Sequence, residues 1–264
     1  LYSSWSALLN AVSWQLPALM LGAFFSPAVV GFYALGVRIL QMPMNLIGNA
    51  VSQVFIQRAA VAKTDGTLAE LVEGLFRRLV MVSLFPMLIL AIIGRDLYVF
   101  LFGHNWAEAG VYAQILSVWA FFWFISSPLS QLFTVLERQE LALKINSLLL
   151  VTRMLSLGIG GYQQSVDLAL FLYAGTGILV YGFLSLKIMQ YSGVTARKSM
   201  AIIWRSFVTF IPFGIGLLAM VITNIPRPAL LLLTLVALAT HGLIVFKRLS
   251  KLVLATLQNI EFET

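Results

Sequence analysis

Residues 30–55 read VGFYALGVRILQMPMNLIGNAVSQVF, an apolar run in which Arg38 is the only charged side chain. A helix needs about 20 predominantly apolar residues to cross the hydrocarbon core of a bilayer. This run is longer, so it predicts a membrane-spanning helix that tilts, kinks or projects beyond the lipid. Polar side chains recur in it every three or four residues and so share one helical face: Arg38, Gln41, Asn45, Asn49 and Ser52.

The composition of the whole chain agrees with this stretch. Of the 264 residues, 60% are apolar and only 10% are charged, with a mean hydropathy of +0.94. A soluble domain carries about a quarter of its residues as Asp, Glu, Lys or Arg. The fold class expected is therefore all-α, a polytopic transmembrane helical bundle.

Apolar runs and helix breakers predict eight spans. Their expected ranges are 7–25, 28–57, 79–101, 108–135, 141–161, 168–188, 202–222 and 229–246. The second and fourth are long, and Pro43 and Pro128 are their expected kinks. Thr67 and Glu70 match a capping box. They predict a short amphipathic helix that lies along the cytoplasmic interface and leads into the third span; a solvated loop is the alternative.

The basic residues predict the orientation, because short cytoplasmic loops carry an excess of Lys and Arg. Thirteen of them fall on one side of the predicted spans and two, Arg95 and Arg227, on the other. Both ends of this sequence are therefore expected in the cytoplasm. The net charge of +7 is read as a topology signal, so no nucleic-acid partner is expected.

The sequence offers little for catalysis or metal binding. It has no cysteine, and its two histidines are His104, in a predicted outer loop, and His241, in the apolar last span. Neither a nucleophile with its base nor a metal site is expected from these residues. We expect a protein that is not an enzyme and that uses no cofactor and no metal.

Polar residues inside other spans suggest a wet interior, since lipid cannot satisfy them. Asn10 and Ser13 share a face of the first span, Ser127, Ser130, Gln131 and Thr134 one of the fourth, and Asn146 and Arg153 one of the fifth. The candidate substrate-binding residues are Arg38, Gln41, Asn45, Asn49, Arg153, Asn10 and Gln131. Amides and hydroxyls could instead be packing contacts. The two arginines could serve structural pairing, although no Asp or Glu lies well inside a span.

Two stretches carry a resemblance to a known family. They are residues 30–55, quoted above, and residues 102–116, FGHNWAEAGVYAQIL, continued by SSPLS at 126–130 and VLERQ at 135–139. Both resemble the polysaccharide-biosynthesis and O-antigen (Wzx-type) flippases of the MOP superfamily, which includes the MATE-like multidrug extruders. Such proteins have two six-helix lobes around a central cavity, and many oligosaccharide members have two extra C-terminal helices.

The resemblance implies both a domain organisation and an activity. Residues 1–190 would be the six-helix C-lobe and residues 191–264 an extra helix pair with a short cytoplasmic tail, packed outside the lobe; an N-lobe would precede Leu1, where no Met stands. The chain would export undecaprenyl-pyrophosphate-linked oligosaccharide repeat units across the bacterial inner membrane by alternating access. Its partners would be that lipid-linked oligosaccharide, membrane lipids and a glycan polymerase or export complex.

Three other interpretations remain open at this stage. One is a multidrug exporter with the same lobes, which would carry acidic residues in the other lobe. Another is a membrane enzyme of glycan assembly, such as an O-antigen polymerase, although the predicted outer loops are short. The third is a scaffold of an export complex or an inactive truncated remnant.

Overall fold

The computed structural model describes residues 2–223, 230, 232–241 and 243, and within them it contains helices and no strand. The α-helices are α1 (Tyr2–Phe24), α2 (Pro27–Pro43), α3 (Asn49–Thr64), α4 (Leu68–Phe102), α5 (Ala107–Ser126), α6 (Leu132–Val135), α7 (Gln139–Tyr162), α8 (Val166–Tyr191) and α9 (Ala196–Ile222). Shorter segments are a π-helix, η1 (Met44–Gly48), and two 3-10 helices, η2 (His104–Trp106) and η3 (Pro128–Gln131). The chain divides into two compact units, Leu1–Pro212 and Phe213–Thr264, which are described separately.

Seven helical segments in the described residues are long and apolar enough to cross a membrane. They correspond to the first seven predicted spans, so the all-α polytopic bundle is confirmed and the chain is a membrane protein. The eighth predicted span, residues 229–246, lies largely outside the described residues; within it, Leu232–His241 is a short apolar helix. The predicted division at residue 190 into a lobe and an extra pair stays a prediction.

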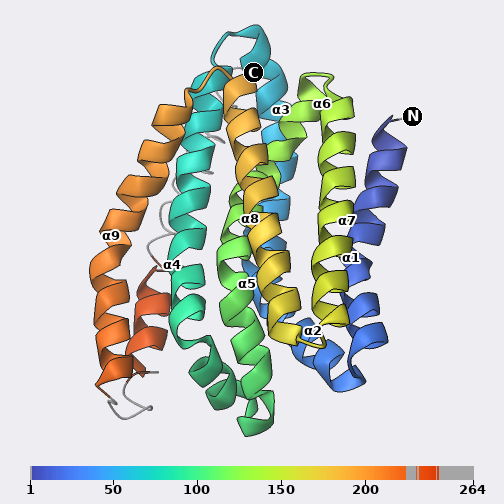
Figure 1. The fold of residues 1–264 in the computed structure, drawn as a ribbon. Helices are drawn as coiled ribbons and strands as arrows, with labels where there is room; N and C mark the ends of the chain where they lie inside the picture. The colour runs from blue at the N-terminus through green and yellow to red at the C-terminus, as the bar shows by residue number, and fades with distance from the viewer. Residues whose placement is uncertain (1, 224–229, 231, 242, 244–264) are drawn as a thin grey trace. The chain divides into compact units, whose positions relative to one another are not determined.

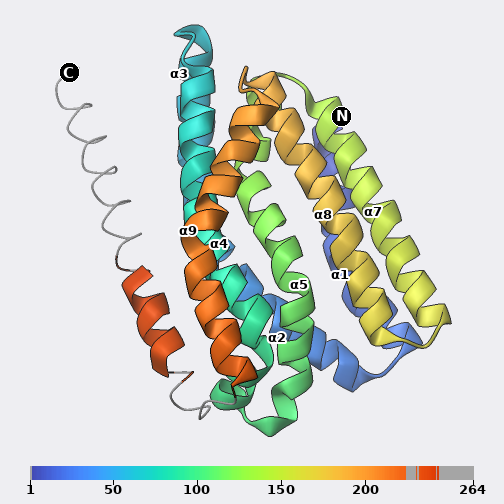
Figure 2. The same cartoon turned by 60° about the vertical axis from the view of Figure 1, so that its left-hand side comes forward.

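In the first unit α5 forms the centre of the packing. It contacts α2, α4 and α8, and α8 in turn contacts α7, which lies along α1 (Figures 1 and 2). Trp119 and Phe124 of α5 and Tyr173 of α8 are almost completely buried there. Apolar side chains such as Leu155 and Leu179 remain exposed on the outside of the unit, as expected for a surface that faces lipid.

Both predicted kinks are confirmed as breaks in α-helical structure. Pro43 ends α2, and the π-helix η1 connects it to α3, which runs in a different direction (Figure 2). Pro128 begins the 3-10 turn η3, which separates α5 from α6. A proline ring lacks a backbone N–H and clashes with the preceding turn, so regular α-helical bonding stops at these positions.

The predicted helix does begin at Leu68, directly after Thr67, but its predicted placement along the interface was wrong. A single helix, α4, runs from Leu68 to Phe102, and its first turns bury Val72 and Phe76 inside the protein. The Thr67 side chain makes no capping bond. The apolar face that was interpreted as membrane-seeking is covered by the chain itself, which removes the reason for it to lie on the lipid surface.

The real break in α4 comes at Ile93, whose φ of −118° and ψ of 16° are not helical. The Gln114 side chain of α5 donates hydrogen bonds from Nε2 to the carbonyl oxygens of Ala91 (3.3 Å) and Ile92 (3.0 Å). A carbonyl left free by a kink in a membrane helix must find another donor, because lipid offers none. Gln114 therefore stabilises the kink from the neighbouring helix.

Candidate functional site

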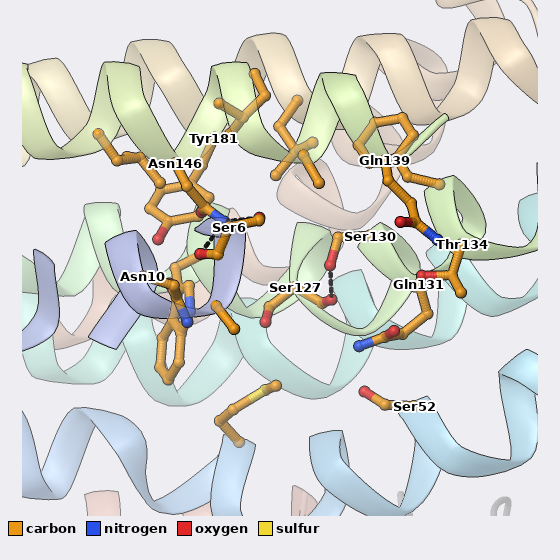
Figure 3. A pocket seen from close by; sticks show the side chains of 18 of the residues that line it. Ser6, Asn10, Ser52, Ser127, Ser130, Gln131, Thr134, Gln139, Asn146 and Tyr181 are labelled. Atoms are coloured by element: carbon orange, nitrogen blue, oxygen red, sulfur yellow. Dashed lines mark hydrogen bonds between the residues drawn. The ribbon is translucent and has the colours of Figure 1, made fainter. Parts of the chain in front are cut away.

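A polar cavity of about 730 Å³ lies within the first unit. Its walls come from five places: the first half of α1, the bend between α2 and α3, the segment from the end of α5 to α6, the first half of α7 and the second half of α8. Figure 3 shows polar side chains from these elements around one space. The residues lining it are Ser6, Ala7, Asn10, Trp14, Met44, Asn49, Ser52, Gln53, Ile56, Trp123, Ser127, Ser130, Gln131, Phe133, Thr134, Gln139, Ala142, Ile145, Asn146, Leu149, Tyr181 and Leu184.

The cavity occupies one end of the bundle. Gln139, the first residue of α7, lines it, and so do Ser6 near the start of α1 and Leu184 near the end of α8. The loops at 65–67, 136–138 and 192–195 lie at this same end (Figure 1). These loops are on the side where the basic residues were counted, so the cavity lies in the half of the bundle that the charge pattern assigns to the cytoplasm.

The lining is uncharged and combines polar with apolar side chains. Its polar side chains are hydroxyls and carboxamides, and its aromatic side chains include Trp14, Trp123 and Tyr181. None of the lining residues within the described part of the chain is Asp, Glu, Lys, Arg or His. Such a surface offers many hydrogen-bond donors and acceptors without demanding an ionic ligand.

Some of these polar groups are already engaged and others are free. Asn146 Nδ2 donates to the Ser6 hydroxyl at 2.8 Å and to its carbonyl oxygen at 3.2 Å. The amides of Asn10, Asn49 and Gln131 make no hydrogen bond to any described residue. All three line the cavity, and both asparagines are exposed. Free carboxamides on a concave wall are suited to bind a ligand that carries hydroxyl or amide groups.

Arg153 lies directly behind this wall, with only 3% of its surface exposed. Its Nη1 donates to the Ser13 carbonyl oxygen at 2.7 Å and to the Ser13 hydroxyl at 2.8 Å. Its Nη2 donates to the Tyr181 hydroxyl at 3.4 Å. The guanidinium also lies over the rings of Trp14 and Tyr173, 4.9 and 5.5 Å from their centroids. These contacts favour the structural alternative for Arg153.

No carboxylate pairs with Arg153 in the described structure. The ion pairs found there both involve Glu73, with Arg77 and with Lys198. The buried charge is balanced instead by a carbonyl, two hydroxyls and two aromatic faces.

The seven predicted site residues are not all brought together. Asn10, Asn49 and Gln131 line the cavity. Gln41 and the exposed Arg38 and Asn45 lie outside the lining, and Arg153 is buried behind it. Neither Arg38 nor Arg153 is thus part of the cavity lining, while the role of each in substrate binding stays a prediction.

The π-turn explains why the stripe of residues 38–52 divides. The N–H of Asn49 bonds the carbonyl oxygen of Met44, five positions earlier, instead of four as in an α-helix. One extra residue in this turn shifts the face of all that follows. Met44 and Asn49 therefore share the cavity side, and Asn45 is exposed away from it.

Sequence reasoning missed the aromatic part of the wall. Trp14 follows Asn10 by four residues, about one helical turn. This spacing predicts that the two side chains share one face of the helix. Tyr181, Gln53 and Gln139 also line the cavity and were not singled out. Tyr181 lies in a span that has no polar stripe. Its position at the cavity is therefore visible only from the packing of α8 against α7.

The described residues contain no group of three or more His, Cys, Asp or Glu side chains that could hold a metal ion.

The fold and the cavity can now be compared with known proteins. Residues 1–111 match the family model described as a polysaccharide biosynthesis protein. Comparison with curated proteins and with solved structures gave no match.

The matched region includes α1 to α4 and thereby the Asn10, Trp14 and Asn49 side of the cavity. It also contains residues 30–55, the first of the two stretches that suggested the resemblance. The family model thus confirms the resemblance over residues 1–111. It supports a role in polysaccharide biosynthesis.

Proposed function

We propose that this protein is a flippase for lipid-linked oligosaccharides, because the chain spans a membrane and part of it matches a polysaccharide-biosynthesis family. The single observation that carries the proposal is the polar, uncharged cavity of about 730 Å³ among helices that cross the membrane. A sugar chain cannot pass through hydrocarbon unless its hydroxyls find partners. The cavity supplies hydroxyl and amide partners between these helices, which lipid does not.

The cargo would be an oligosaccharide repeat unit joined to undecaprenyl pyrophosphate. Its glycan would enter the cavity, while its polyprenyl tail stays in the surrounding lipid. Arg38 is the proposed contact for the pyrophosphate, because it is exposed on α2 and has no carboxylate partner among the described residues. A guanidinium fork matches phosphate oxygens in a bidentate way.

The proposed mechanism is alternating access in the inner membrane, without a chemical reaction on the glycan. The cavity lies at the end that carries the basic loops, so it represents the half of the pathway that opens to the cytoplasm. There it would receive a newly assembled repeat unit. Release on the other face then requires the cavity to close at this end and open towards Tyr162, the last residue of α7.

The proposal is tested in cells of the source organism that carry the altered gene at its own locus. The variant combines Asn10→Ala and Gln131→Ala, which removes two free cavity amides. We expect surface polysaccharide to fall and the lipid-linked repeat unit to accumulate on the cytoplasmic leaflet. The control is Thr152→Ala on α7, whose hydroxyl bonds only the carbonyl oxygens of its own helix.

Membrane levels of each variant are measured alongside export. If the lipid-linked repeat unit does not accumulate when the gene is deleted, the flippase proposal is wrong. Unchanged export by the double variant, at normal protein levels, would remove the cavity from the pathway. Arg38→Ala and Arg38→Lys, compared in the same assay, test the pyrophosphate contact separately.

A further inference from the structure

Arg153 lies between two aromatic rings that have different surroundings on their far sides. Tyr173 is buried in the packed interior, whereas Trp14 lines the cavity. The guanidinium centre is 4.9 Å from the Trp14 centroid and 5.5 Å from that of Tyr173. The Arg153 guanidinium therefore lies against one face of the Trp14 ring.

The hydrogen bonds of Arg153 fix the neighbours of that ring as well. Two of them go to Ser13, the residue directly before Trp14, and engage both its carbonyl oxygen and its hydroxyl. The third goes to the hydroxyl of Tyr181, which lines the cavity. A single side chain therefore ties the backbone of α1 and two wall residues to α7.

Trp123 completes this aromatic part of the wall. Its ring contacts that of Trp14 edge-on, with 5.1 Å between centroids and an interplanar angle of 62°. Trp14, Trp123 and Tyr181, here called the aromatic wall, stand next to the free amides of Asn10 and Asn49. A broad ring surface beside hydrogen-bonding groups matches a pyranose, whose C–H face is apolar and whose rim carries hydroxyls.

Three of the five N–H donors of Arg153 are bonded within the protein, and its side chain is almost fully buried. Direct contact with a ligand in the cavity would require breaking those bonds, which is costly for a buried charge. We infer that Arg153 is a positioning residue: it holds the aromatic wall rigid, so that an uncharged sugar ring can stack on it. This inference rests on the proposed function for the identity of the cargo.

The experiment uses the full chain in detergent with its tryptophans replaced by 5-fluorotryptophan. The sequence contains six tryptophans, and the fluorine resonance of Trp14 is assigned by its loss in Trp14→Phe. The probe is N,N′-diacetylchitobiose, a neutral disaccharide. We expect one narrow Trp14 resonance that shifts as the disaccharide is added.

Arg153→Met removes the bonds and the charge while keeping a long apolar side chain. The Trp14 resonance should then split or broaden without ligand, and the affinity for chitobiose should fall about tenfold, which corresponds to about 1.4 kcal/mol. Arg153→Lys keeps the charge but loses the guanidinium fork. Its Trp14 resonance should therefore be narrower than that of Arg153→Met and broader than that of the unaltered chain. If Met destabilises the fold, Lys still provides the comparison.

The matched control is Tyr98→Phe, which removes a buried interhelical hydrogen bond from Tyr98 to the Gly36 carbonyl oxygen, away from the cavity. It should leave the Trp14 resonance unchanged. A narrow, unshifted Trp14 line in Arg153→Met would overturn the positioning role. A Trp14 resonance that does not shift when chitobiose is added to the unaltered chain would overturn the inference that a sugar stacks on the aromatic wall, whatever the export assay shows. Normal chitobiose binding, together with no accumulation of the lipid-linked repeat unit when the gene is deleted, would count against the flippase proposal alone.

Discussion

Arg153 reaches Ser13 with two hydrogen bonds, 2.7 Å to the carbonyl oxygen and 2.8 Å to the hydroxyl. One heptad earlier on each helix, Asn146 makes the same pair of bonds with Ser6. Both pairs join residues 140 positions apart, so α1 and α7 run parallel and in one register. Polar side chains thus define how these two helices align, in a solvent where apolar packing alone discriminates poorly.

Asn146 and Ser6 should be energetically coupled. A double-mutant cycle with Asn146→Ala and Ser6→Ala is expected to give a coupling of about 0.6 kcal/mol, the average that such cycles find for interhelical hydrogen bonds in a membrane, and at most about 1.7 kcal/mol. The measurement is reversible unfolding of the purified protein in mixed micelles. Thr152→Ala, which loses bonds only within α7, serves as the uncoupled reference. Additive effects of the two alanines would contradict a shared bond.

Two glycines on α7 should respond oppositely to alanine. A Cβ at Gly160 would collide with the backbone of Ala169 on α8, so Gly160→Ala should lower the free energy of unfolding by about 1–3 kcal/mol. A Cβ at Gly158 would meet only Met20 Cε at 3.8 Å. There the better helix propensity of alanine should leave stability unchanged or raise it by about 0.5–1 kcal/mol. Equal effects at both sites, measured by thermal unfolding, would argue against the tight α7–α8 contact.

The kink of α4 gives a third prediction. Gln114→Leu removes the donor to Ala91 and Ile92 and leaves their carbonyl oxygens without this partner. The protein should lose about 1 kcal/mol of stability, with faster amide exchange confined to residues 94–102. Hydrogen exchange with mass spectrometry measures this. Protection that falls evenly over all of α4 would show that Gln114 does not act at the kink.

The sequence predicted the first seven spans and the breaks at Pro43 and Pro128 because both depend on local chemistry. Apolar length sets a span, and Pro43 and Pro128 cannot continue regular α-helical bonding whatever surrounds them. The polar stripe at 127–134 was also recovered, since Ser127, Ser130, Gln131 and Thr134 all line the cavity.

Other features depend on contacts between distant segments. The π-turn after Pro43 changes the helical period that the stripe of residues 38–52 assumed, so only its later part reaches the cavity. The amphipathic start of α4 has the pattern of an interfacial helix, and only the packing around Val72 and Phe76 shows otherwise. The surroundings of Arg153 likewise come from α1 and α8, far away in the sequence.

The topology prediction concerns the orientation of the bundle. Reporter fusions after Trp106 and after Asp167 should report a periplasmic location, and fusions after Lys63, Gln139 and Arg197 a cytoplasmic one. The reason is the excess of basic residues at the end that carries the loops 65–67 and 136–138. An alkaline phosphatase and fluorescent-protein fusion series provides the measurement. The inverted pattern would place the cavity on the periplasmic side.

The last prediction tests the cavity itself. The chain contains no cysteine, so a single introduced thiol reports without background. Ser130→Cys should react rapidly with a membrane-impermeant maleimide, because Ser130 lines a cavity that is large enough, and has enough polar groups, to hold water. Reaction should occur in inverted membrane vesicles and not in right-side-out ones, because the cavity lies at the basic end of the bundle.

Two further single-cysteine variants of α7 make the result specific. Met154 is 49% exposed on the lipid-facing side, so Met154→Cys should react slowly from either side. Tyr162 is 88% exposed at the opposite end of α7, so Tyr162→Cys should react only in right-side-out vesicles. Rapid labelling of Met154→Cys would mean that water reaches the presumed lipid face. Labelling of Ser130→Cys from the same side as Tyr162→Cys would show that the pathway in this conformation opens at the other end, because two thiols at opposite ends of one bundle cannot otherwise share an accessible face.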